Sequence, residues 1–341
     1  MKTYFDISGW EEKKHLQTKG TRDKSVVQNP ENGEMYYFKT SIKKDKKDYK
    51  YEFWSEIIAS KIGRALGFNV LQYEIANKSG KIGCLSKAMN KENETLTEGI
   101  SFLTAYDNSY RPDSKSSYSL YTLDLICNAL KCFNIERHID DIYRTLIFDF
   151  IIGNSDRHQE NWGFISESES QSFLEKVHQH LKKIPIVKKV IRLILPRTYH
   201  FVSGWFIKKK EKYRFAPIYD NGCCLCREIN DDKISLMLHN PQKINAYVDN
   251  QSKSEIRTPD GNKYKHIELM YEIKKRNKDF FNSEINRIVA SYDEQKLREI
   301  VYTIDNALPN QFAADKLPKE RKELMLKIIS LRIDRLRNLL K

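Results

Sequence analysis

A polar loop between two apolar runs contains residues whose types and spacing could serve catalysis and metal binding. The apolar run from Ile147 ends at Gly153, no hydrophobic residue occurs from Asp156 to Asn161, and Trp162 resumes the apolar character. Rigid elements on either side would hold such a loop in place, as they do for catalytic loops. The Asp156 carboxylate could accept the proton of an attacking hydroxyl, and five residues later the neutral Asn161 amide could hold Mg²⁺. The alternative is an Asx-rich turn that caps a helix and starts a strand.

A second acidic turn follows later in the chain. Residues 215–219 predict a short apolar strand, with Asp220 at its end and Asn-Gly after it. Asp156, Asn161 and Asp220 together would make the oxygen-rich site that Mg²⁺ prefers when substrate phosphates supply its other ligands. Taken alone, this segment is readily explained as a plain Asp-Asn-Gly turn. Two acid-bearing loops in this order nevertheless favour a phosphotransferase.

A lysine and a glutamate upstream could serve the same site. Residues 35–40 predict a strand on which Lys39 shares a face with bulky apolar residues. Its ammonium group could reach a phosphate in a cleft; the alternative is a surface lysine whose stem lies along apolar groups. Glu56 lies among or beside the inward-facing positions of a helix predicted for 52–66. A carboxylate there requires a cationic partner, and Lys39 is the nearest upstream candidate.

The elements that would position these residues form a mixed pattern, which predicts the α+β class. A hairpin, a helix and a second hairpin come first, and helical periodicity dominates from His266 to the C-terminus, as expected for a packed helical lobe. The turns expected for the two hairpins lie at 29–33 and 77–80. The other expected elements are strands at 26–27, 35–40, 70–75 and 81–85, and helices at 52–66, 120–133 and 139–150.

The bulk composition narrows the class of protein. A chain of 341 residues is long enough for two lobes, and its formal charge of +13 suits phosphates, nucleic acid or an anionic membrane as partners. Residues 1–30 contain no apolar block, so we expect no signal peptide, and no run reaches the roughly 18–20 apolar residues needed to span a bilayer. The six cysteines lack paired zinc-site spacing. We expect buried thiols in the cytoplasm, with a soft-metal cluster at 223–226 as the alternative and a secreted or translocated effector left open.

Residues 173–214 carry most of the net charge. They hold twelve Lys or Arg and two Glu, a difference of +10, and an apolar stripe at 187–195 has basic residues on its other side. Such a segment could contact an anionic membrane or dock a partner, and the alternative is a locally packed insertion with a solvated basic face. Its aromatic residues form no recognisable stacking motif, so we expect no specific nucleic acid.

At this point the sequence resembles the HipA-like serine/threonine kinase family, and most closely its compact, CtkA-like members. The segments that carry the resemblance are 153–161, which is similar to the family's catalytic segment, and 216–222, which is similar to its metal-binding Asp segment. Phe38-Lys39 resembles the nucleotide-binding lysine, and 55–67 resembles its partner helix.

The resemblance implies a role for each matching residue. Asp156 would be the catalytic base and His158 would brace its loop, while Asn161 and Asp220 would hold Mg²⁺. Lys39 would contact the ATP phosphates and Glu56 would anchor it. The remaining cofactor-binding residues would be Gly20 and Lys24 in a phosphate-covering loop at 20–25, and Ser86 and Met89 in a hinge facing adenine.

The resemblance also implies an architecture and an activity. The fold would be bilobal and protein-kinase-like, with a small β-rich N-lobe at 1–89, a larger helical C-lobe at 90–341 and a basic insertion at about 166–213. The activity would be ATP- and Mg²⁺-dependent transfer of the γ-phosphoryl group to a protein Ser or Thr hydroxyl, including autophosphorylation. The family's best-known members are toxins restrained by a helix-turn-helix antitoxin, so such a partner is an expectation here too. The alternatives are a lipid (phosphoinositide-like) kinase and a non-catalytic basic module that binds membrane or nucleic acid.

Overall fold

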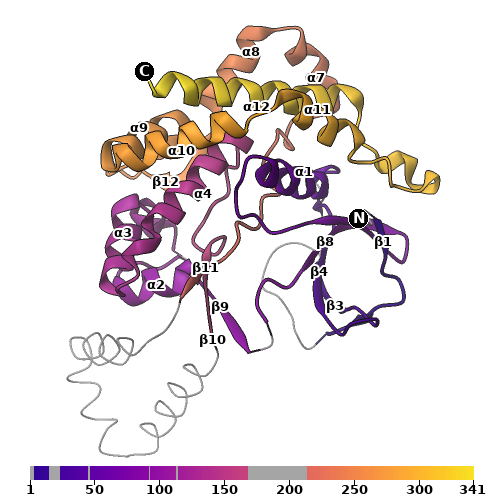
Figure 1. The fold of residues 1–341 in the computed structure, drawn as a ribbon, viewed down its shortest axis with the longest axis horizontal. Coiled ribbons are helices and arrows are strands. Elements are labelled where there is room, and N and C mark those ends of the chain that lie inside the picture. The colour runs from indigo at the N-terminus through magenta and orange to yellow at the C-terminus, as the bar shows by residue number, and fades with distance from the viewer. Residues whose placement is uncertain (1–3, 15–23, 45–46, 92, 113, 168–212) are drawn as a thin grey trace, which may run out of the picture.

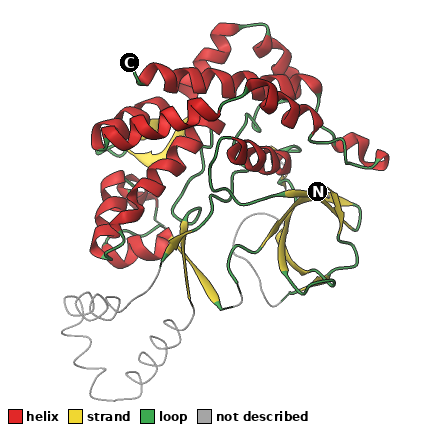
Figure 2. Ribbon diagram, in the orientation of Figure 1, coloured by secondary structure: helices red, strands yellow, loops and turns green. Residues whose placement is uncertain are grey.

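The computed structural model describes residues 4–14, 24–44, 47–91, 93–112, 114–167 and 213–341. Its strands gather mostly in one part of the molecule, where they form a strongly curled sheet, and helices make up most of the remainder (Figure 2). This is the bilobal α+β architecture expected from the sequence. No helix within the described ranges is both long enough and apolar enough to cross a bilayer.

A six-stranded sheet forms the strand-rich part, in the order β1-β7-β8-β4-β3-β2. The expected first hairpin is confirmed: β3 and β4 pair antiparallel, and Gly33 takes a φ of 72° in the turn between them. β4 pairs on its other side with β8, so that Lys39 lies opposite Cys84 in the middle of the sheet. The strand bounds are β1 Tyr4–Asp6, β2 Glu11–Glu12, β3 Lys24–Gln28, β4 Met35–Lys39, β7 Glu74–Lys78 and β8 Lys81–Lys87.

The second hairpin begins later than the sequence predicts. Its turn lies at Ser79-Gly80, where both residues have positive φ, but the first strand starts at Glu74 instead of Val70. Val70 pairs in parallel with Ile218, and Leu71 N–H donates to the Ile218 carbonyl at 2.9 Å. The prediction was wrong at this end because the backbone there bonds to a distant segment, which local periodicity cannot reveal.

Helix α1 (Glu52–Ala65) lies between the sheet and the helical part (Figure 1) and is the predicted helix 52–66. Its apolar positions, including Trp54, Ile57 and Ile62, are fully buried against β8 and the helical part. Gly67 follows with a φ of 77°, the left-handed conformation that ends helices. The helix therefore reaches into both parts of the molecule, with Glu56 on its buried side.

The polar loops lie beside a small three-stranded sheet in the order β11-β10-β9. The apolar strand expected at 215–219 is shorter than predicted: β11 ends at Phe215 because Pro217 has no N–H to continue the ladder. The expected helix at 139–150 is confirmed as α4, and that at 120–133 starts later, at Leu123, because the Thr122 side chain caps it. The bounds are β9 Glu94–Glu98, α2 Gly99–Tyr106, α3 Leu123–Cys132, α4 Ile139–Ile152, β10 Gly163–Glu167 and β11 Arg214–Phe215.

The C-terminal third is helical, as expected, and packs around α4. Helix α12 contacts α4, α7, α10 and α11, and its apolar stripe supplies much of the core (Figure 1). α10 was not foreseen, because only Asn277 separates it from α9 and its sequence is largely polar. The bounds are α7 Asp231–Leu238, α8 Pro241–Ala246, α9 His266–Arg276, α10 Lys278–Ser291, α11 Glu294–Thr303 and α12 Lys319–Leu339, with short hairpins β5 Lys43–Lys44 with β6 Lys47–Asp48 and β12 Lys253–Arg257 with β13 Lys263–Lys265.

Candidate active site

One buried arginine joins the two polar loops. The Arg157 guanidinium is only 2% exposed and pairs with Asp149 on α4 at 2.7 Å. It also donates to the Asn161 carbonyl at 2.8 Å, to Asn221 Oδ1 at 2.6 Å and to the Tyr219 carbonyl. Charge-assisted bonds of this kind fix geometry strongly in a site shielded from water. The loop that carries Asp156 and the loop that carries Asp220 are therefore held in one fixed relation.

Lys39 lies at the centre of a buried ionic cluster. Its Nζ is 3.3 Å from Glu56 Oε1 and 3.2 Å from Asp220 Oδ1, which lies 181 residues further along the chain. Burial lowers the pKa of Lys39, but the carboxylates of Asp220 and Glu56 raise it more, so its pKa lies well above the usual range. Glu56 uses its other oxygen to accept the Asn221 N–H at 2.7 Å. The lysine and the glutamate expected to be partners are thus in contact.

The Asp156 loop orients its side chains through short local bonds. Asn161 Nδ2 donates to the Asp156 carbonyl at 2.7 Å, a bond that does not engage the amide oxygen. Oδ2 of Asp156 accepts the Cys223 thiol at 3.1 Å. His158 is about one-third exposed, and its Nδ1 accepts the Glu160 N–H at 3.3 Å. The bracing role expected of His158 stays a prediction, whereas Arg157 visibly joins the two loops.

A cavity of about 450 Å³ brings most of the expected site residues together, a size within the usual range of ligand pockets. Glu56 lies behind Lys39 and outside the lining. Gly20 falls outside the described residues. The expected residues that line the cavity are Lys24, Lys39, Ser86, Met89, Asp156, His158, Asn161 and Asp220.

The lining of the cavity combines cationic and apolar groups. Burial and the nearby Lys39 lower the pKa of Lys24 to about 8, and its ammonium lies 4.6 Å from the centre of the Tyr37 ring. Two lysines in one cavity form a site for an anion. Elsewhere Leu71, Met89 and Leu96 contribute apolar surface. Such a cavity suits a ligand with a flat apolar part and an anionic part.

Some residues of the site were not expected from the sequence. Arg157 and its partner Asp149 were missed, although an acid inside the apolar run 147–152 signals a buried cation. Tyr73 was missed as well: its hydroxyl accepts the Asp220 N–H at 3.4 Å, and Lys39 lies 5.7 Å from the centre of its ring. Cys223 was expected to be a small buried hydrophobe or part of a soft-metal cluster, and its contact with Asp156 was missed.

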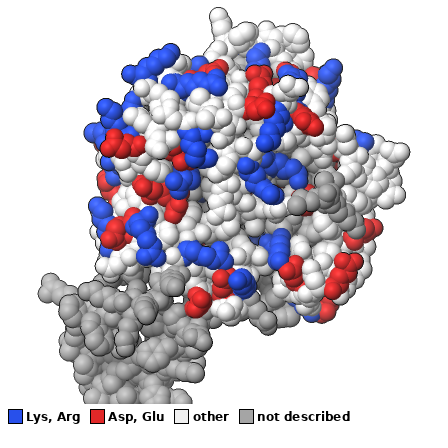
Figure 3. Space-filling model, viewed as in Figure 1, with Lys and Arg blue, Asp and Glu red and all other residues white. Residues whose placement is uncertain are grey.

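The basic stretch lies almost entirely outside the described residues, which resume at 213. The structure therefore says nothing about the expected insertion at 166–213 beyond its ends, nor about a membrane contact. At its C-terminal end, Arg214 pairs with Glu94 at 2.8 Å and donates to the Met89 carbonyl. On the face shown in Figure 3, basic and acidic side chains are interspersed over the helical part.

Comparisons with known proteins agree with this geometry. Residues 6–174 match the family model described as HipA-like C-terminal domain. The serine/threonine-protein kinase CtkA of Helicobacter pylori strain J99 is 22% identical over 280 residues, which cover 79% of this chain and 70% of the relative.

Solved structures extend the likeness to nearly the whole chain. The crystal structure of the Helicobacter pylori proinflammatory kinase CtkA superposes with a TM-score of 0.70 at 19% identity, covering 99% of this chain and 98% of that one. The HipA toxin–antitoxin complex of Shewanella oneidensis MR-1, with HipB and operator DNA, gives a TM-score of 0.50 at 11% identity, covering 96% of this chain and 66% of that one. In sequence and in fold, the chain is similar to the HipA-like serine/threonine kinases.

Proposed function

We propose that the protein transfers the γ-phosphoryl group of ATP, with Mg²⁺, to a Ser or Thr hydroxyl of a protein, itself included. The observation that carries the proposal is the convergence of Lys39, Asp156, Asn161 and Asp220 on one cavity. Phosphoryl transfer needs little beyond positioning and neutralisation of charge, which these side chains supply. The acceptor oxygen bonds to the γ-phosphorus, its proton passes to the Asp156 carboxylate, and ADP leaves.

The nucleotide would lie with its phosphates at the lysine end. Lys39, held by Glu56, contacts the phosphates, and Lys24 adds a second cation to the same end of the cavity. Adenine would lie against the apolar end, near Ser86 and Met89. Gly20 keeps its expected place in the phosphate-covering loop as part of the proposal.

The residues present fit a magnesium ion. Asn161 donates with its amide nitrogen and keeps its oxygen for a ligand role, and Asp220 offers a carboxylate on the same cavity. Among the described residues no group of three or more His, Cys, Asp or Glu could hold a metal, so phosphate oxygens would supply the other ligands. When bound, the ion neutralises charge on the phosphates. His158 would help to shape the loop beside Asp156.

The lobe boundaries and partners are part of the same proposal. The N-lobe at 1–89 would cover the nucleotide, and the C-lobe at 90–341 would carry both polar loops. The HipA relative was solved with HipB and operator DNA, and we infer that a helix-turn-helix antitoxin is a candidate partner here. We also propose a cytoplasmic location, which the six free cysteines suit.

The test is phosphate transfer from labelled ATP. The purified chain, with Mg²⁺ and a mixed protein substrate, should label protein hydroxyls, and Asp156→Asn should lower the rate by about a hundredfold or more. Asp220→Asn should raise the Mg²⁺ concentration needed for half-maximal activity. Transfer that is unchanged in Asp156→Asn contradicts the proposal. Transfer to phosphoinositide vesicles but to no protein favours the lipid kinase.

A further inference from the structure

Three cavities follow one another, and Asp156 lines the first two. The nucleotide cavity shares Asp156, His158 and Glu160 with a second cavity of about 330 Å³. Neither Lys39 nor Asp220 lines this second cavity. An acceptor hydroxyl must come within hydrogen-bond reach of Asp156 without displacing the nucleotide. The second cavity provides that approach.

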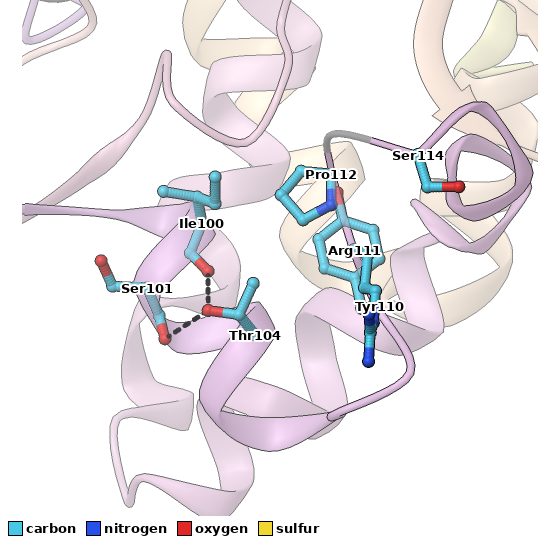
Figure 4. Close-up of a pocket in the computed structure, with 7 residues that line it drawn as sticks. All are labelled: Ile100, Ser101, Thr104, Tyr110, Arg111, Pro112 and Ser114. Carbon is cyan, nitrogen blue, oxygen red and sulfur yellow. Dashed lines mark hydrogen bonds between the residues drawn. The ribbon is translucent and has the colours of Figure 1, made fainter.

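A third cavity prolongs the second one. The two share Tyr110 and Pro112, and the third has a volume of about 660 Å³. Figure 4 shows Ser101 and Thr104 of α2 on one side of it, and on the other side Tyr110, Arg111, Pro112 and Ser114. The Thr104 hydroxyl donates to the Ile100 carbonyl at 2.8 Å, so it is engaged within its own helix. A small acceptor would fill the second cavity alone, whereas an extended peptide, at about 3.3 Å per residue, would need both.

The charges of the second cavity select for a cation. Its lining holds three carboxylates, Asp156, Glu160 and Glu255, against the single guanidinium of Arg257. Glu255 pairs with Lys263 and lies 3.7 Å from Arg257, so its charge is largely balanced. Glu160 is about half exposed, and its carboxylate lies 3.7 Å from Nδ1 of His158. The Glu160 carboxylate therefore remains available to a ligand beside the catalytic base.

We propose that the second and third cavities form the acceptor groove, and that it takes an extended protein segment with Lys or Arg beside the target Ser or Thr. Glu160 pairs with that cationic residue. Tyr110 and Tyr118 provide the flat walls along which the segment lies. This inference rests on the proposed function, because the groove is defined by Asp156 acting on a hydroxyl.

The experiment compares matched peptides on the full-length chain. One peptide carries Ser flanked by Lys, and its partner carries Glu at the same positions. With Mg²⁺ and ATP, kcat/KM should favour the Lys peptide by about fivefold, since a partly exposed ion pair contributes up to about that factor. Glu160→Lys should invert the preference and Glu160→Gln should remove it. Glu299→Lys, an exposed position on α11, is the matched control and should leave the preference unchanged.

Peptides of different length test the outer part of the groove, which the third cavity forms. Ser101→Trp, an exposed position on α2, should raise KM for a long peptide and leave a short one unaffected. A preference for the Lys peptide that survives Glu160→Lys overturns the assignment of Glu160. Equal sensitivity of long and short peptides to Ser101→Trp overturns the extended groove.

A measurement of peptide binding distinguishes a failure of this inference from a failure of the proposed function. Fluorescence anisotropy with labelled peptides, Mg²⁺ and a non-hydrolysable ATP analogue reports the same charge preference as affinity. Absence of transfer with the preference intact would count against the proposed kinase activity alone. Transfer to protein with no preference between the two peptides in either measurement would count against the groove alone.

Discussion

The Cys223 thiol donates to Asp156 Oδ2 at 3.1 Å, and the Arg227 guanidinium donates to the same sulfur at 3.0 Å. Arg227 also pairs with Glu52 in the first turn of α1. Four residues further along that helix, Glu56 holds Lys39. Helix α1 therefore contacts Lys39, the proposed phosphate-binding lysine, directly through Glu56. It reaches Asp156, the proposed catalytic base, through Arg227 and the Cys223 thiol. The position of α1 thus affects both residues.

Removing the thiol should slow catalysis without impairing nucleotide binding. Cys223→Ala deletes a hydrogen bond to an ionised group, and we expect kcat to fall about tenfold with KM for ATP little changed. Cys223→Ser keeps a donor at the same place and should restore most of the rate. Steady-state kinetics check this, with Cys132→Ala at an exposed position as the control. Full activity in Cys223→Ala would show that the thiol does not position Asp156.

Arg157→Leu should destabilise the protein and separate the two loops. The substitution leaves the buried Asp149 carboxylate without its cation, and breaking one side of a buried pair costs about 3–5 kcal/mol. Denaturant unfolding measures the loss. The double variant Arg157→Leu, Asp149→Leu should recover much of the stability, but not activity, because the bonds to Asn161 and Asn221 stay absent. Recovery of activity in the double variant would contradict the role of Arg157 in joining the loops.

Lys39→Met should lower both stability and nucleotide affinity, for different reasons. Glu56 is almost fully buried and would lose its ion pair, which lowers the free energy of unfolding. Adding Glu56→Gln removes the buried charge that lost its lysine and should restore the melting temperature, while ATP binding stays weak because the Lys39 ammonium no longer faces the phosphates. A thermal-shift titration with ATP and Mg²⁺ reports both quantities. A double variant that binds ATP normally would exclude Lys39 as a phosphate ligand.

The local features of this site could be predicted from the sequence, but not all of its long-range contacts could. The Asp156 loop, the Asp220 turn and the first hairpin follow from residue types and spacing, because turns and amphipathic helices are local. Val70 pairs with Ile218, and Cys223 contacts Asp156. These residues are far apart in the sequence, and hydrophobic periodicity does not reveal such contacts. Asp149 could have been noticed as a buried acid, but its partner Arg157 looked like an ordinary polar loop residue.

A buried histidine should make stability fall at acidic pH. His266 is buried at the start of α9. Burial and the nearby Arg332 lower its pKa from 6.5 to about 3, against a smaller opposing effect of the Lys253 and Asn154 backbone. Between those values the unfolded chain binds a proton that the folded chain does not, so stability decreases as pH falls through this window, by at most about 1.4 kcal/mol per pH unit. Above pH 6.5 the effect disappears.

Urea unfolding between pH 7 and pH 4.5 measures this contribution. His266→Gln should be less stable at pH 7 because the packing changes, yet its stability should fall less steeply with decreasing pH than that of the unmodified chain. His239→Gln, at an exposed position on the surface, is the control and should keep the original slope. Identical slopes for His266→Gln and the unmodified chain would mean that His266 takes up a proton in the folded state as readily as in the unfolded one, and the acid sensitivity would then have to come from the carboxylates.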